Sequence, residues 1–133
     1  MEPLAPTCSP AEHPGVRKQF PMPGTLAIER ASRVCRALGE PARLRLMARL
    51  AGGECCVTEL AEAEGEELST ISQRLRVLRA ENIVVRRRRG KHINYSLADD
   101  HMSDLVSTVL AHASEPVEPV LKDDQQTEEE AKA

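Results

Sequence analysis

The chain has 133 residues, of which 41% are hydrophobic and only 2% aromatic, and its net charge is −3. This length suits one domain with one core, and so few aromatic side chains exclude a base-stacking platform for single-stranded nucleic acid. No apolar run reaches the roughly 18 residues that a membrane span needs, and no secretory signal is recognisable, so we expect a cytoplasmic protein whose four cysteines stay reduced.

Prolines divide the chain into three parts. Six of the nine prolines lie in residues 1–23, and two more stand at positions 116 and 119. We therefore expect a flexible arm over residues 1–23, a folded domain over residues 24–115 and a disordered acidic tail over residues 116–133.

Hydrophobic periodicity predicts four helices at the start of the folded domain. Glycines end the first three helices, Pro41 suits the first turn of the second, and Ser69 is placed to cap the fourth. The predicted helices cover residues 25–38, 41–50, 56–64 and 70–80.

A hairpin and a last helix follow. Residues 83–85 and 93–97 predict two strands joined by a tight turn at Arg89-Gly90. The last helix is expected over residues 99–114 and is ended by Pro116. The expected fold is therefore mainly α with a small β-hairpin.

The fourth helix and the hairpin concentrate positive charge. Residues 66–95 carry eight basic and three acidic groups, a net charge of +5 within an acidic chain, which indicates a site for a polyanion. A short helix, a glycine turn, a second helix with exposed polar side chains and a basic hairpin are together typical of a winged helix-turn-helix that binds double-stranded DNA. Such a helix contacts base edges in the major groove, and such a hairpin contacts the backbone or the minor groove. The candidate DNA-binding residues are Ser69, Thr70, Ser72, Gln73, Arg74, Arg76, Arg79, Arg87, Arg88, Arg89 and Lys91.

Four segments resemble the ArsR/SmtB family of metal-sensing bacterial repressors. They are residues 37–46 (ALGEPARLRL), 54–60 (ECCVTEL), 69–75 (STISQRL) and 90–97 (GKHINYSL). The resemblance covers about residues 25–115. It implies a homodimeric winged helix-turn-helix protein, mainly α with a small β-hairpin wing, whose folded domain both binds DNA and dimerises. It also implies a repressor that binds promoters without metal and leaves them when metal binds.

The last helix carries a candidate metal site shared between two copies. His101 and His112 are 11 residues apart, so they share a helix face although their Cα atoms lie about 16 Å apart. Two such helices packed antiparallel across a dimer would set Asp99 and His101 against His112 and Glu115 of the second copy. Two imidazoles and two carboxylates suit tetrahedral zinc, and the family's last-helix site resembles this set position by position.

The resemblance implies a second, thiol-containing site. In relatives with such a site, an N-terminal arm donates ligands to the third helix of the partner. Here Cys56 fills the first position of the family's Cys-Val-Cys motif, Thr58 replaces the second cysteine, and Glu59 stands at the acidic position. The candidate ligands are Cys8, His13, Cys56 and Glu59, with Cys55 added for soft ions such as Cu(I), Ag(I) or Cd(II).

These features predict a repressor that binds operator DNA as a metal-free homodimer and is released by zinc, or by cadmium, copper(I) or silver(I). The alternative is a repressor of the same fold that senses oxidants or reactive sulfur through Cys55 and Cys56. An enzyme is not expected, because so small a chain offers no cleft for a zinc ion with an open coordination position. The expected partners are double-stranded operator DNA and a second copy of the chain, with no membrane and no small organic substrate.

Overall fold

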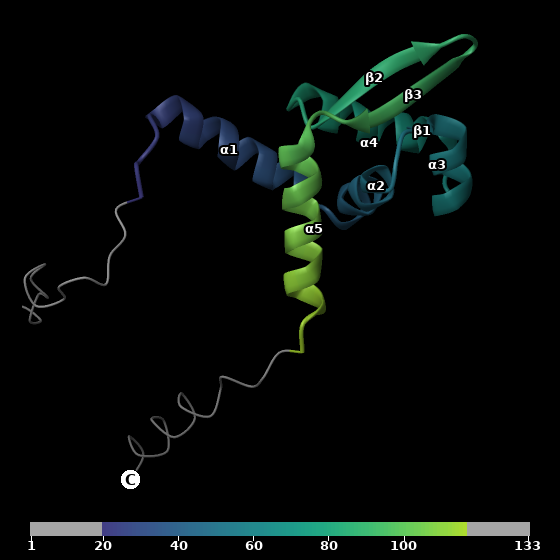
Figure 1. Cartoon of the computed structure of the whole chain (residues 1–133). Coiled ribbons are helices and arrows are strands. Elements are labelled where there is room, and N and C mark those ends of the chain that lie inside the picture. Colours follow the sequence, from purple (N-terminus) through teal and green to yellow (C-terminus); the bar gives the residue numbers. More distant parts are fainter. Residues whose placement is uncertain (1–19, 117–133) are drawn as a thin grey trace, which may run out of the picture.

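The computed structural model describes residues 20–116, which form five helices and three short strands (Figure 1). The helices are α1 (Thr25–Leu38), α2 (Pro41–Ala51), α3 (Val57–Glu64), α4 (Leu68–Ala80) and α5 (Asp100–Ser114). The strands are β1 (Cys55–Cys56), β2 (Val84–Arg89) and β3 (His92–Leu97). The expected mainly helical fold with a β-hairpin is confirmed.

Local sequence signals explain most helix ends. Gly39 follows α1, and Pro41 opens α2 after Glu40, whose side chain accepts a hydrogen bond from the backbone N–H of Arg43 at 2.9 Å. Gly65 ends α3 with φ of +66°, a left-handed conformation that favours glycine. Asp99 caps α5 by accepting the backbone N–H of Met102 at 3.1 Å.

Two local predictions were wrong. Cys56 does not begin the third helix, because Cys55 and Cys56 form β1, which pairs antiparallel with β3 at Tyr95 and Asn94. Ser69 does not cap the fourth helix, because α4 already begins at Leu68 and its N-cap is Glu67, which makes no side-chain capping bond. The strand partners are separated by about forty residues along the sequence, so no local pattern signalled β1.

The sheet has the order β1-β3-β2 and is antiparallel throughout. Gly90, with φ of +64°, forms the predicted turn between β2 and β3, whose register runs from Val84 opposite Leu97 to Arg89 opposite His92. The base of the hairpin is buried at Val84 and Tyr95, and its outer half extends from the body. The hairpin is therefore anchored at its base and exposed at its tip.

One apolar core holds α2, α4, the hairpin base and α5 together. Its fully buried side chains come from all of these elements and from α3. They include Leu46, Met47, Leu60, Ile71, Leu75, Leu78, Ile83 and Val106. None of the helices between residues 20 and 116 is long and apolar enough to cross a bilayer.

The helix α1 is only partly covered by the rest of the chain (Figure 1). Its C-terminal end packs on the core through Ala37, with Val34 and Leu38 beside it, whereas Leu26 and Ile28 remain 59% and 46% exposed. An apolar groove of about 380 Å³ runs between α1, α2 and α5, and Cys35, Leu38, Leu44, Leu105 and Val109 are among its lining residues.

Candidate functional site

The helix α4 buries one face and presents a polar one. Ile71, Leu75 and Leu78 fix the buried face. Five of the predicted DNA-binding residues are exposed on the rest of the helix, namely Ser69, Ser72, Gln73, Arg76 and Arg79. Thr70 and Arg74 are half-buried instead, on the side of α4 that faces α2. The Arg74 guanidinium Nη2 lies 3.6 Å from Glu66 Oε1, so this side chain does not point straight outward.

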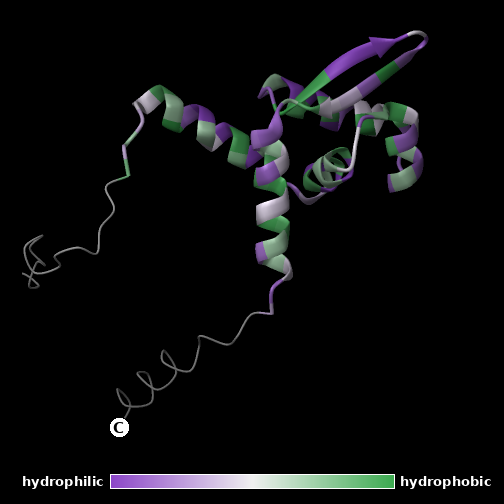
Figure 2. Ribbon diagram, viewed as in Figure 1, coloured by the Kyte–Doolittle hydropathy of each residue, from purple (hydrophilic) through white to green (hydrophobic). Residues whose placement is uncertain are grey.

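The tip of the hairpin carries the densest positive charge. Arg87, Arg88, Arg89 and Lys91 are all exposed, and the outer half of β2 is hydrophilic along its length (Figure 2). Arg88 Nε donates to the carbonyl oxygen of Gly90 at 3.3 Å. Arg89 Nε donates to Glu54 Oε1, also at 3.3 Å, which ties the tip to the residue before β1. The polar face of α4 and the basic hairpin together form a surface of the kind that binds a DNA groove and its backbone.

The candidate ligands of α5 lie in two pairs, one at each end of the helix. His101 Nδ1 is 3.6 Å from Asp99 Oδ1, and His112 Nδ1 is 4.0 Å from Glu115 Oε2. The two imidazoles are 90% and 87% exposed, so both pairs are accessible to an ion. Each pair would supply two of the four ligands that tetrahedral zinc takes.

The candidate thiol ligands are divided by β1. Cys56 Sγ lies 3.2 Å from Glu59 Oε1, which brings together two of the predicted ligands. Cys55 packs against the core, and its Sγ lies 3.6 Å from the carbonyl oxygen of Gly53. Cys55 and Cys56 point to opposite faces because side chains alternate along a strand. Burial, and after it the negative charge of Glu59, raises the pKa of the Cys55 thiol.

Residues 20–116 of one copy do not complete either candidate metal site. Within residues 20–116, no three His, Cys, Asp or Glu side chains are grouped so that they could hold one ion. Cys8 and His13 lie outside the described residues.

Sequence reasoning missed two residues at this surface. Glu54 pairs with a hairpin arginine 35 positions away, and Arg43 of α2 lines a pocket together with Thr70 and Arg74. Charge alone could have marked both as candidates, but only the fold shows their partners.

A bundle of helices with a helix–turn–helix and a basic β-hairpin defines the class of winged helix-turn-helix proteins. The solution structure of the homodimeric winged helix-turn-helix DNA-binding domain of a Mycobacterium bovis protein matches with a TM-score of 0.64 and 32% identity, over 66% of this chain and 82% of that one. The winged helix-turn-helix fold predicted from the sequence is thus confirmed.

Sequence comparisons identify the family. The profile of the bacterial regulatory proteins of the arsR family matches residues 40–85. A transcriptional repressor SmtB homolog of Synechocystis is 40% identical over 96 residues, covering 70% of this chain and 73% of that protein. The transcriptional regulator NmtR of Mycobacterium tuberculosis is 40% identical over 97 residues, covering 73% of this chain and 80% of that protein. The chain belongs to the ArsR/SmtB family, whose fold is that of DNA-binding transcriptional regulators and not of enzymes.

Proposed function

We propose that this protein is a metal-responsive transcriptional repressor, which binds operator DNA as a metal-free homodimer and is released by zinc. Cadmium, copper(I) and silver(I) are the alternative inducers, and the cytoplasm is the expected compartment. The observation that carries the proposal is the pair of half-sites on α5, where Asp99 lies beside His101 and His112 lies beside Glu115.

The basic surface supports binding to double-stranded DNA. The outward side chains of α4 offer hydroxyl, amide and guanidinium groups to base edges. The exposed arginines and lysine of the hairpin tip supply backbone or minor-groove contacts. The solved relative from Mycobacterium bovis is itself a DNA-binding domain.

The uncovered faces of α1 and α5 support dimerisation through these helices. The groove between α1, α2 and α5 is lined almost wholly by apolar side chains, including Val109, which is 45% exposed. Ile28 of α1, which does not line the groove, is also 46% exposed. A second copy would remove this apolar surface from water, which is the main favourable term in association. The homodimeric state of the Mycobacterium bovis domain supports dimerisation of this fold.

The chemistry of the α5 side chains fits zinc. Imidazole and carboxylate are zinc ligands, and the four side chains of α5 remain largely exposed, with no buried role that an ion would disrupt. A dimer with antiparallel α5 helices would combine Asp99 and His101 of one copy with His112 and Glu115 of the other. An ion bound there would link the two copies and would favour one angle between them. Release follows if that angle moves the two α4 helices away from the spacing of successive major grooves, about 34 Å.

The alternative function, a sensor of oxidants or reactive sulfur, is supported less well by Cys55 and Cys56 than the metal sensor is by the α5 side chains. The raised pKa of Cys55 lowers its thiolate fraction, and the thiolate is the reactive form. Cys55 and Cys56 also lie on opposite faces of the sheet, so they are poorly placed to bridge to each other.

Gel-shift titration of the DNA complex separates the two functions. Metal sensing predicts that zinc releases the DNA under reducing conditions and that oxidant or persulfide does not. Release by oxidant or persulfide alone would contradict metal sensing and support the thiol sensor.

A further inference from the structure

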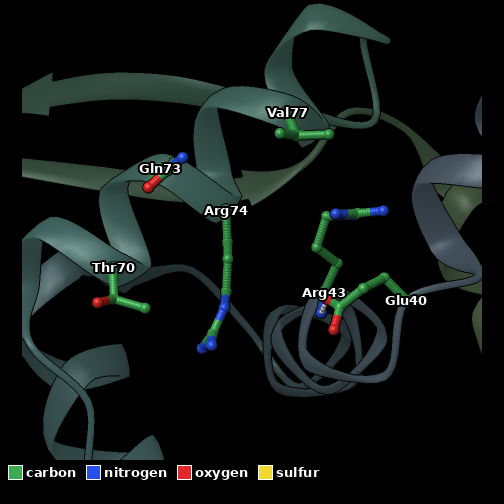
Figure 3. A pocket seen from close by; sticks show the side chains of 6 residues that line it. All are labelled: Glu40, Arg43, Thr70, Gln73, Arg74 and Val77. Atoms are coloured by element: carbon green, nitrogen blue, oxygen red, sulfur yellow. Dashed lines mark hydrogen bonds between the residues drawn. The ribbon is translucent and has the colours of Figure 1, made fainter.

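A polar pocket of about 310 Å³ lies between the start of α2 and the side of α4 that faces it (Figure 3). Thr70, Gln73, Arg74 and Val77 share one face of α4 at helical spacing and form one wall. Glu40 and Arg43 form the other wall. In Figure 3 the Arg74 side chain extends from α4 toward α2, so its guanidinium lies inside this space rather than on the outer surface of the helix.

Arg43 is held in place by three hydrogen bonds. Its Nε donates to the carbonyl oxygen of Ala37 at 2.6 Å and its Nη2 to that of Arg36 at 3.4 Å. Its backbone N–H donates to Glu40 Oε2. The guanidinium therefore binds the carbonyl end of α1, where a positive charge is favoured. Since two of its nitrogens already donate to α1, Arg43 stays at the wall of the pocket and has fewer donors left for a ligand.

The guanidinium of Arg74 has fewer contacts within the described residues than that of Arg43. Its one ion-pair partner among residues 20–116 is Glu66, at 3.6 Å on the solvent side, and 25% of the Arg74 side chain is exposed. A surface ion pair of this length contributes little, so the guanidinium can exchange Glu66 for a stronger acceptor. Thr70 lies one turn before Arg74 on the same wall, and in Figure 3 its methyl group is on the side of Arg74 while its hydroxyl points away.

The pocket opens on the side of α4 that faces α2. The helix α1 is joined to this end of α2 by the short turn at Gly39. Because α2 packs on both α4 and α5, association of two copies through α1 and α5 would turn this side of α4 toward the two-fold axis. The stretch of DNA backbone beside the pocket is then the one between the two half-sites, whereas other parts of the duplex lie against the hairpins.

We propose that this pocket seats a phosphodiester of the operator backbone between the half-sites, with Arg74 as its contact and Arg43 as a positioning residue. This inference rests on the proposed function. A guanidinium binds phosphate oxygens with two parallel donors, so Arg74 alone can hold one phosphodiester. The carboxylate of Glu40 opposes the anion and so provides a variant whose effect has the opposite sign.

The test uses the full chain and a duplex that it selects from random sequence, with salt-dependent binding followed by fluorescence anisotropy. Arg74→Gln should weaken binding to all sequences alike, by about tenfold, and reduce the slope of log affinity against log salt by about two for the dimer. Glu40→Gln, which keeps an oxygen to cap α2, should strengthen binding severalfold. Arg45→Gln is the matched control, since it removes one arginine of α2 that pairs with Glu64 instead of lining the pocket.

Duplexes with single neutral methylphosphonate linkages locate the contact. When the neutral linkage replaces the contacted phosphate between the half-sites, Arg74→Gln and Glu40→Gln should no longer change the DNA affinity. Thermal unfolding of each variant checks that the fold is intact.

Two results would overturn the assignment and leave the proposed function standing. One is DNA binding that depends on Arg88 but is the same in the wild type, Arg74→Gln and Glu40→Gln. A weaker affinity of Arg74→Gln with an unchanged salt slope would count in the same way. The other is release of DNA by inorganic phosphate beyond that caused by chloride at equal ionic strength, which would assign the pocket to a free anion. A wild-type chain that binds no duplex at all would overturn both.

Discussion

Asp99 has an observed structural role and a proposed functional one. Its carboxylate caps α5 through the backbone N–H of Met102 and lies beside His101. The two roles differ in what they require, because a cap needs only an oxygen acceptor whereas a zinc ligand of this kind needs a carboxylate.

Asp99→Asn and Asp99→Ala should therefore separate the cap from the ligand. Asparagine is as good an N-cap as aspartate, so Asp99→Asn should keep stability, whereas Asp99→Ala should cost about 1 kcal/mol in the free energy of unfolding. Both should weaken zinc binding to a similar extent. Urea unfolding and zinc titration measure the two effects, and full zinc affinity in Asp99→Asn would remove this residue from the site.

The acidic end of α3 provides a pH-dependent contact. Arg49 and Arg45 both pair with Glu64, whose side chain is 8% exposed, and these arginines hold the pKa of Glu64 below its ordinary value of 4.5. Since the lowered pKa belongs to the folded state, the contribution of Glu64 is complete above pH 4.5 and is lost as the pH falls through the lowered value.

Glu64→Gln should reduce the free energy of unfolding at pH 7 by about 1 kcal/mol. The difference between the variant and the wild type should shrink as the pH is lowered. Urea unfolding at pH 7 and pH 4 measures it, with Glu62→Gln on the exposed side of the same helix as control. Equal loss in both variants would show that the arginine pairs add nothing beyond charge.

At the scale of elements, we expect α4 and the hairpin to make different contacts with DNA. Gln73 is exposed on the outer face of α4, where an amide can pair with adenine in the major groove. Arg88 is exposed near the turn of the hairpin, where its charge can meet phosphates.

Gln73→Ala should therefore relax sequence preference while changing the salt dependence little. Arg88→Ala should weaken binding to every sequence and lower the salt slope by about one for each phosphate that the shortened side chain no longer reaches. Competition between matched and mismatched duplexes over a range of salt measures both. The reverse pattern would exchange the roles given to the two elements.

The elements also show what sequence could reveal and what it could not. Glycine and proline signals placed the ends of α1 and α2, and the alternation of residues 93–97 predicted β3, because these features act through neighbouring residues. The strand β1 exists only because Cys55 and Cys56 meet β3 after the chain has folded. The start of α4 at Leu68 was missed because Ser69, a good N-cap residue, stands one position inside the helix.

In the candidate sites too, the sequence predicts contacts between residues close along the chain and misses those that folding brings together. The pairs of Asp99 with His101 and of Cys56 with Glu59 are close in sequence, so the sequence alone could predict them. The separation of Cys55 from Cys56 came from the strand, and the pocket that joins Arg43 to Arg74 came from the packing of α2 on α4.

At the scale of the whole molecule, one copy of the chain is incomplete in two respects. Among residues 20–116, it leaves the apolar groove beside α1 and α5 open, and it offers only two of the proposed zinc ligands at each end of α5. A dimer through these helices resolves both.

Val109→Asp should disrupt that dimer, because it places a charge on the groove wall. Sedimentation at micromolar concentration without metal should show a dimer for the wild type and a monomer for Val109→Asp, with DNA affinity falling together with dimerisation. Ser107→Asp, on an exposed position of the same helix that does not line the groove, is the control. A wild-type monomer under these conditions would contradict the proposed assembly.

The central claim is that the α5 side chains control DNA release by zinc. The most direct measurement is the affinity for operator DNA, with and without zinc, of the wild type, His101→Ala and Cys56→Ser, together with their zinc stoichiometry. We predict that zinc weakens DNA binding of the wild type and of Cys56→Ser, and that DNA weakens their zinc binding by the same factor. We predict that His101→Ala stays on the DNA. Zinc-induced release that survives in His101→Ala and is lost in Cys56→Ser would contradict the account and assign control to the thiol site.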